Sequence, residues 1–216
     1  MISLHTRKIW LVRHGQSKAQ TEEELSIDSG LSRLGTKQAK RLAKALKDVN
    51  FDRIYVSPLK RARETFEHSR LRGSEIRFDS RAVEEMPEGA YSQLLPYGNL
   101  PDYAEKDKQD AWNLDARSRA SSLMNELYAS EARQILVVSH FGFLNHLLKV
   151  FFSGSENTQS LPKYCHINNT GISVFSIGTD RKQDFVVAWN DIRHVYDLIS
   201  PDPLSPLTDA HPDPRP

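Results

Sequence analysis

The sequence predicts an α/β fold, a three-layer α/β/α sandwich with a mostly parallel central sheet, helices on both faces and a lid insertion. Residues 8–13 and 134–139 are short, nearly continuous apolar runs, which is typical of buried parallel strands. Segments with apolar residues at helical spacing lie between such runs. Strands that alternate with helices favour a sheet that is covered on both faces.

The remaining elements follow in order along the chain. Further strands are predicted at 52–57, 75–78, 172–177 and 185–189, and helices at 35–49, 59–68, 114–130 and 143–152. The first helix shows the pattern clearly, because Ala39, Leu42 and Leu46 share one face and basic residues occupy the other. Pro58 ends the strand before it, since proline cannot donate to a strand ladder.

The domain organisation predicted is one domain over residues 1–199. Residues 86–112 are rich in Pro, Gly, Tyr and Asp and carry no long periodic run, so we expect an insertion or lid there. From residue 200 the chain is dense in Pro and Asp, which predicts an extended or disordered tail over 200–216.

Composition and charge narrow the class of protein. The 216 residues carry a net charge of +1, so no overall field attracts nucleic acid or an acidic membrane, and any attraction for anions must be local. No run reaches the roughly 18 apolar residues that span a bilayer. The N-terminus lacks signal-peptide features, and the single cysteine, Cys165, cannot form an internal disulfide. We therefore expect a cytoplasmic protein with no nucleic-acid or membrane partner; whether it is a monomer or a homodimer stays open.

Basic and imidazole side chains follow the predicted strands where a ligand would bind. In an open α/β sheet the crevice lies beyond the carboxyl ends of the strands. His14 and His140 each lie just past such an end, and Arg61 lies in the turn or helix after a third strand. We expect these residues, together with Arg13, to converge on one edge of the sheet.

Together these residues have the chemistry of phosphoryl transfer. Two guanidinium groups, Arg13 and Arg61, can bind a phosphate dianion and neutralise its charge. One of the two imidazoles can attack phosphorus while the other donates hydrogen bonds to the phosphate oxygens. A leaving alkoxide also needs a proton, which Glu84 or Glu85 could supply.

Other catalytic classes fit the sequence less well. His146 follows His140 by six residues, and this is not the spacing that places two metal ligands on one helix face. Ser139 lacks the Gly-x-Ser-x-Gly turn of a serine nucleophile. We expect neither a metal nor another cofactor, since the arginines can carry the charge stabilisation.

From about residue 8 to about residue 177 the chain resembles the histidine phosphatase superfamily, the branch typified by cofactor-dependent phosphoglycerate mutase. The resemblance rests on five ordered motifs, which are Leu11-Val-Arg-His-Gly-Gln-Ser17, Leu31-Ser-Arg-Leu-Gly-Thr-Lys-Gln-Ala39, Ser57-Pro-Leu-Lys-Arg-Ala-Arg-Glu-Thr65, Arg81-Ala-Val-Glu84 and Val137-Val-Ser-His-Phe-Gly142. It implies that His14 is phosphorylated, that Arg13, Arg61 and His140 bind phosphate, and that Glu84 protonates the leaving oxygen.

Three positions depart from the family pattern. Gln20 stands where the family often has Asn, which keeps an amide near the phosphate. Phe141 replaces the usual Gly after the second histidine, and we expect its ring to narrow the entrance or to stack on substrate. The residues after Glu84 differ from the family's usual continuation, so Glu85 and Glu88 stay open as alternatives for the acid.

Three functions stay open from the sequence. The first is a metal-independent phosphomonoesterase acting on a small phosphorylated metabolite, with a phosphoprotein as the alternative substrate. The second is a mutase, although residues 20–30 are acidic and lack the Asn-Arg-Phe-Thr-Gly-Trp-like segment of that group. The third is a phosphate- or phosphoprotein-binding module without turnover.

Overall fold

The computed structural model describes residues 7–24, 26–85, 115–153, 165–178 and 181–199. Its strands are β1 (Arg7–Arg13), β2 (Phe51–Val56), β3 (Gly73–Phe78), β4 (Gln134–Ser139), β5 (Ile172–Ile177) and β6 (Phe185–Asp191). Its α-helices are α1 (Arg33–Ala45), α2 (Lys60–Ser69), α3 (Ala116–Ala129) and α4 (Phe141–Ser153). Short 3₁₀ helices add η1 (Lys18–Thr21), η2 (Ser80–Ala82), η6 (Arg181–Gln183) and η7 (Arg193–Leu198). The predicted lid and tail lie outside these residues.

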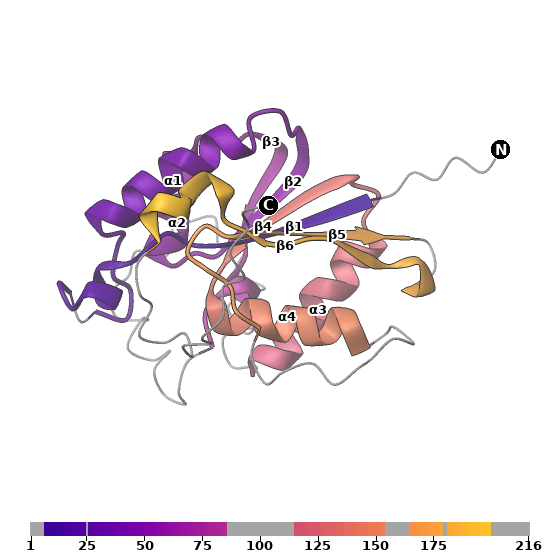
Figure 1. Ribbon diagram of the computed structural model, residues 1–216. Coiled ribbons are helices and arrows are strands. Elements are labelled where there is room, and N and C mark those ends of the chain that lie inside the picture. Colours follow the sequence, from indigo (N-terminus) through magenta and orange to yellow (C-terminus); the bar gives the residue numbers. More distant parts are fainter. Residues whose placement is uncertain (1–6, 25, 86–114, 154–164, 179–180, 200–216) are drawn as a thin grey trace.

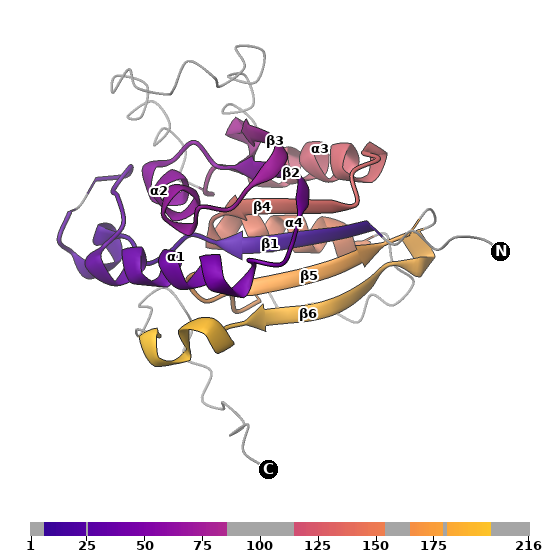
Figure 2. The same ribbon diagram turned by 90° about the horizontal axis from the view of Figure 1, so that it is seen from above.

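The six strands form one sheet in the order β3-β2-β4-β1-β5-β6 (Figure 2). Neighbouring strands from β3 to β1 run parallel, whereas β5 is antiparallel to β1 and β6 is antiparallel to β5. The prediction of a mostly parallel sheet is confirmed. The antiparallel pair has a local cause, because only a short connection joins β5 to β6 and a parallel crossover needs a dozen or more residues.

Helices cover both faces of the sheet, as predicted (Figure 1). One core lies under α1 and α2, and the other lies under α3 and α4. Strand β4 serves both, since Leu136 and Val138 belong to the first core and Ile135 and Val137 to the second. This alternation explains why the strand is apolar throughout: successive side chains point to opposite faces, and both faces are buried.

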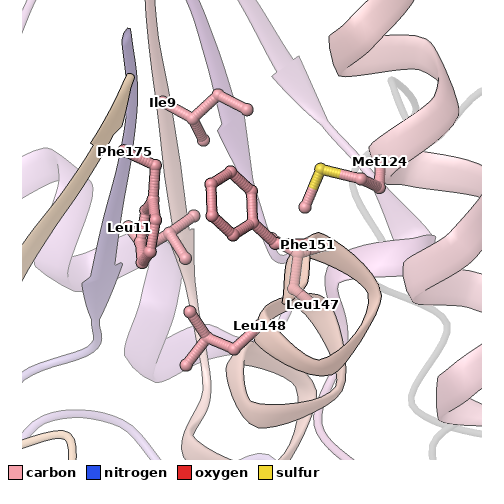
Figure 3. A pocket seen from close by; sticks show the side chains of 7 residues that line it. All are labelled: Ile9, Leu11, Met124, Leu147, Leu148, Phe151 and Phe175. Carbon is pink, nitrogen blue, oxygen red and sulfur yellow. The ribbon is translucent and has the colours of Figure 1, made fainter. Parts of the chain in front are cut away.

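The second core contains a pocket lined only by apolar side chains from β1, β5, α3 and α4 (Figure 3). The ring of Phe151 reaches from α4 toward the sheet between Ile9 and Phe175. No space large enough for a water molecule remains between them. This region is therefore packing that holds α4 against β1, not a ligand site.

Helix α1 begins two residues earlier than predicted, and a cap explains the difference. Ser32 Oγ accepts a hydrogen bond from Gly35 N at 3.1 Å, which satisfies one of the free N–H groups at the helix start. The same turn touches the loop after β1. A Cβ atom on Gly35 would lie 2.0 Å from the carbonyl oxygen of Gln16, so only glycine allows this approach.

The segment from 193 to 198, for which no helix was predicted, forms η7 and packs against α1. Gln38 donates to the carbonyl of Leu198 at 2.9 Å, and Arg41 forms an ion pair with Asp197. Among the described residues no helix is long and apolar enough to cross a membrane.

We expect Gly35→Ala to destabilise the protein by about 1–3 kcal/mol, because the added methyl group must push the Gln16 carbonyl away. Urea denaturation of the purified variant measures the free energy of unfolding. Lys37→Ala, at an exposed position of the same helix, is the control and should stay within about 0.5 kcal/mol of wild type. Equal free energies of unfolding for Gly35→Ala and wild type would show that the Gln16 carbonyl can move away without cost.

Candidate active site

The pairing of β1 with β4 brings the two predicted histidines together. Arg13 pairs with Ser139 in the parallel ladder, and His14 N donates to the Ser139 carbonyl at 2.9 Å. His14 and His140 are thus the next residues on adjacent strands, and their ring centroids lie 5.0 Å apart. Both side chains are buried, which is unusual for histidine, and two buried histidines side by side indicate a functional site.

The ring of His14 is held in one tautomer. Its Nδ1 lies 2.6 Å from the carbonyl oxygen of Gly15, which can only accept, so Nδ1 carries the proton. Nε2 accepts a hydrogen bond from Arg61 Nε at 3.3 Å and therefore keeps its lone pair. The result is a neutral imidazole whose unprotonated nitrogen faces a guanidinium group.

Electrostatics keep both rings neutral. Burial lowers the pKa of His14 well below its usual 6.5, and the positive charges of Arg61 and Arg13 lower it further. Burial also lowers the pKa of His140, and Arg61 is the largest of the charges that add to this effect. A buried ring beside cations cannot easily take up a second positive charge.

Both predicted phosphate arginines reach this place and are themselves nearly buried. Arg13 ends β1 and donates from Nη1 to the Ile167 carbonyl at 2.9 Å. Arg61 lies in the first turn of α2 and donates from Nη1 to the Ile27 carbonyl at 2.9 Å. These anchors fix the planes of two guanidinium groups around one buried pair of imidazoles, which is an arrangement suited to a phosphate dianion.

Glu84 and Glu85 point to different places. The Glu84 carboxylate accepts a hydrogen bond from the backbone N–H of Phe143 at 3.1 Å. Phe143 lies in the first turn of α4, three residues after His140. Its negative charge also raises the pKa of Arg61, against a larger lowering by burial. Glu85 is exposed and pairs instead with His146, 3.2 Å away. Glu84 is thus the acid that lies beside the site, and Glu88 lies outside the described residues.

Gln20 helps to hold the loop that follows β1, residues 14–17. Its side-chain oxygen accepts from Ser17 N at 3.0 Å, which caps η1, and its amide pairs with that of Asn169 at 3.3 Å. Asn169 in turn donates to the His14 carbonyl at 2.9 Å. Direct contact of Gln20 with phosphate stays a prediction.

Phe141 packs on Arg13, one of the two predicted phosphate arginines. The guanidinium carbon of Arg13 lies 5.3 Å from the centre of the Phe141 ring, a cation–π contact. The ring is partly exposed and opens α4 directly after His140. Its predicted part at the entrance or on the substrate stays a prediction, and the structure adds that it fixes a face of Arg13.

Sequence reasoning missed several side chains that hold the site. Ser57 Oγ lies 2.6 Å from His140 Nε2, and Thr65 Oγ1 accepts from Gly15 N at 2.9 Å. Both belong to the motif that suggested Arg61, so that motif could have indicated them. Arg119 on α3 is wholly buried and donates to backbone carbonyls next to Glu84; nothing in its helical context distinguishes it from an exposed arginine.

A strained turn at Asn169 and Thr170 holds the backbone of Arg13 and His14. Thr170 is buried with φ 57°, a left-handed conformation that β-branched residues rarely adopt. This conformation lets Thr170 N donate to the Arg13 carbonyl while Asn169 holds that of His14. Residues about 155 positions downstream in the chain thereby fix the end of β1.

Comparisons with known proteins agree with this geometry. The family model for the histidine phosphatase superfamily (branch 1) matches residues 9–192. A probable 2-carboxy-D-arabinitol-1-phosphatase of Arabidopsis thaliana is 31% identical over 78% of this chain, which spans only 38% of that longer protein. A relative from Hydrogenobacter thermophilus, provisionally named phosphoserine phosphatase 2, is 27% identical; the match covers 89% of this chain and 99% of the relative.

Solved structures share the fold. A phosphoserine phosphatase of Entamoeba histolytica in complex with phosphoserine superposes with a TM-score of 0.60 at 21% identity; the match covers 88% of this chain and 99% of that one. The α-ribazole phosphatase of Shigella flexneri gives a TM-score of 0.59 at 20% identity, over 85% of this chain and 96% of that one. The family model covers most of the chain, and the buried pair of histidines lies where its motifs meet, so this protein belongs to branch 1 of the histidine phosphatase superfamily.

Proposed function

We propose that this protein is a metal-independent phosphomonoesterase that acts through a phosphohistidine at His14 on a small phosphorylated metabolite. The observation that carries the proposal is the state of the His14 ring. Nδ1 is fixed as a donor to the Gly15 carbonyl, so Nε2 is the ring nitrogen that carries the lone pair, and this lone pair points to Arg61 Nε, 3.3 Å away. The family supports the same chemistry.

In the first step the Nε2 lone pair of His14 attacks phosphorus. Glu84 enters this step in its protonated form; the bond between phosphorus and the leaving oxygen breaks while Glu84 donates that proton to the oxygen, so an alcohol leaves and Glu84 becomes a carboxylate. Arg13 and Arg61 stabilise the charge on the transferring group. Nδ1 of His140 is buried and has no hydrogen-bond partner in the described part of the chain; a phosphate oxygen would satisfy it.

In the second step water attacks the phosphohistidine. Glu84, now a carboxylate, takes a proton from the water, and the phosphorus–nitrogen bond breaks to release inorganic phosphate and neutral His14. The carboxylate is therefore acid in one step and base in the next. The two arginines supply the charge that other phosphatases obtain from metal ions, which is why we propose no metal.

The substrate proposed is a small monophosphate. Relatives carry names of phosphatases for phosphoserine, carboxyarabinitol phosphate and ribazole phosphate. The predicted lid holds Asp102, Glu105, Asp107 and Asp110 against Lys106 and Lys108, which is a poor surface for a polyphosphorylated ligand. The single cysteine keeps the cytoplasm as the proposed compartment.

Rapid quenching of the enzyme with a labelled phosphomonoester tests covalent catalysis. We expect acid-labile, base-stable label on wild type and none on His14→Ala, because that variant lacks the Nε2 atom proposed to attack phosphorus. Release of inorganic phosphate marks a phosphatase, and transfer to a second hydroxyl marks a mutase. The absence of both label and turnover across a broad panel of phosphomonoesters would leave only a binding module.

Changing the leaving group tests Glu84. Glu84→Gln should lower kcat/KM for alkyl phosphates by about 10²–10⁴, the usual contribution of a positioned acid. The loss on p-nitrophenyl phosphate should be under about tenfold, since that leaving group needs little protonation. Glu85→Gln is the matched control and should change neither substrate more than about twofold, because Glu85 faces His146. Equal losses on both substrates with Glu84→Gln would move the acid role elsewhere.

Nitrogen-15 NMR of labelled histidines tests the charge state. At pH 6.5 we expect His14 to be neutral with its proton on Nδ1, whereas the urea-unfolded chain is half protonated there. The sign follows for stability: as pH falls through 6.5 the unfolded chain binds protons that these rings refuse, so the free energy of unfolding decreases. Arg61→Met should raise the pKa of His14. An imidazolium at His14 in wild type at pH 6.5 would contradict the proposed nucleophile.

A further inference from the structure

Arg119 is a wholly buried guanidinium group whose described hydrogen bonds run to the backbone of the segment that carries Glu84. Its Nη1 donates to the carbonyls of Arg81 and Val83, both at 2.8 Å, and its Nη2 donates to the carbonyl of Glu84 at 3.2 Å. Burial of an arginine is unfavourable unless its hydrogen bonds are satisfied. Three hydrogen bonds to three carbonyls within residues 81–84 make it a clamp on that segment.

The carboxylate of Glu84 is held by the first turn of α4, which also contacts Arg119. Phe143 N donates to Glu84 Oε1, and the Phe143 ring lies 5.4 Å from the guanidinium carbon of Arg119. A Cβ atom on Gly142 would lie 2.7 Å from Glu84 Oε1, so the carboxylate lies tightly against the first turn of α4. Arg119 fixes the backbone of Glu84, and α4 fixes its carboxylate.

We propose that Arg119 is a positioning residue for the general acid. It holds the backbone of Glu84 so that the Glu84 carboxylate reaches the leaving oxygen. This inference rests on the proposed function. Misplacing a catalytic group by about 1 Å can cost about a hundredfold in rate. The planar fork of arginine can donate to several carbonyls in fixed directions, which the single ammonium of lysine cannot reproduce.

The same guanidinium also acts on the second histidine. Arg119 is one of the charges that lower the pKa of His140, after burial, Arg61, His14 and Arg13. The Arg119 guanidinium on α3 therefore holds the segment that carries Glu84 and also helps to lower the pKa of His140. A residue that served only to pack α3 would have no effect on how the rate depends on the leaving group.

The test compares Arg119→Lys and Arg119→Met with Glu84→Gln in the full-length protein. The readout is the ratio of kcat/KM for phosphoserine, or the best alkyl phosphate in a panel, to kcat/KM for p-nitrophenyl phosphate. Arg117→Met is the matched control, because Arg117 lies on the same helix and is exposed. Circular dichroism and the affinity for inorganic phosphate check that each variant keeps its fold and its phosphate site; Arg119→Lys keeps the charge if Arg119→Met fails to fold.

We expect both Arg119 variants to lower the ratio at least about tenfold, with inorganic phosphate bound within about threefold of wild type, since Arg13 and Arg61 are untouched. Arg117→Met should leave the ratio unchanged. Arg119→Lys combined with Glu84→Gln should lower the ratio no further than Glu84→Gln alone, because both changes remove one function.

Two outcomes overturn the inference in distinguishable ways. A ratio that falls in Glu84→Gln but not in folded Arg119 variants would show that Arg119 only packs. A ratio that is unchanged in Glu84→Gln would remove the acid assignment in the proposed function, and the role of Arg119 would be lost with it. An additive effect in the double variant would also contradict positioning through Glu84.

Discussion

The parallel pairing of β1 with β4 is the constraint on which the site depends. Both strands end at the same edge of the sheet, so the next residue of each, His14 and His140, must emerge side by side. Burial on both faces fixes the register, since a slip of one residue would turn every core side chain to the wrong face. The register that fixes the core therefore also fixes the positions of the two histidines.

The close grouping of these side chains determines the charge state of the two histidines. Two guanidinium groups converge on two buried imidazoles, and the cost of adding a further positive charge keeps both rings neutral. The same positive charge would attract a phosphate dianion. In the proposed function, one arrangement thus keeps His14 neutral for attack and binds the phosphate that it attacks. The support comes from distant segments, because Asn169, Thr170 and Thr65 all bond to the backbone between Arg13 and Gly15.

Glu84 belongs to a different part of the framework. It follows η2, outside any strand ladder, and its place depends on α3 and α4 instead of the sheet. This explains why the sequence left Glu84, Glu85 and Glu88 open as candidates for the acid. Hydrophobic periodicity locates strands and helices, but it does not specify which of two adjacent glutamates in a connecting segment turns inward. The contacts of Glu85 with His146 and of Glu84 with Phe143 separate the two.

The sequence by itself determined the strands, most helix positions, the mostly parallel sheet and the edge where His14, His140, Arg13 and Arg61 gather. These features depend on local patterns, namely apolar runs that end at polar turns, together with a general rule on where ligands bind such sheets. Only the tertiary structure decided the tautomer of His14, the inward direction of Glu84 and the clamp made by Arg119. Each of these depends on a hydrogen bond with a group from another element, 35 to 59 residues away in the chain. Such contacts leave no periodic trace in the sequence, because the residue types that make them also occur on solvated surfaces.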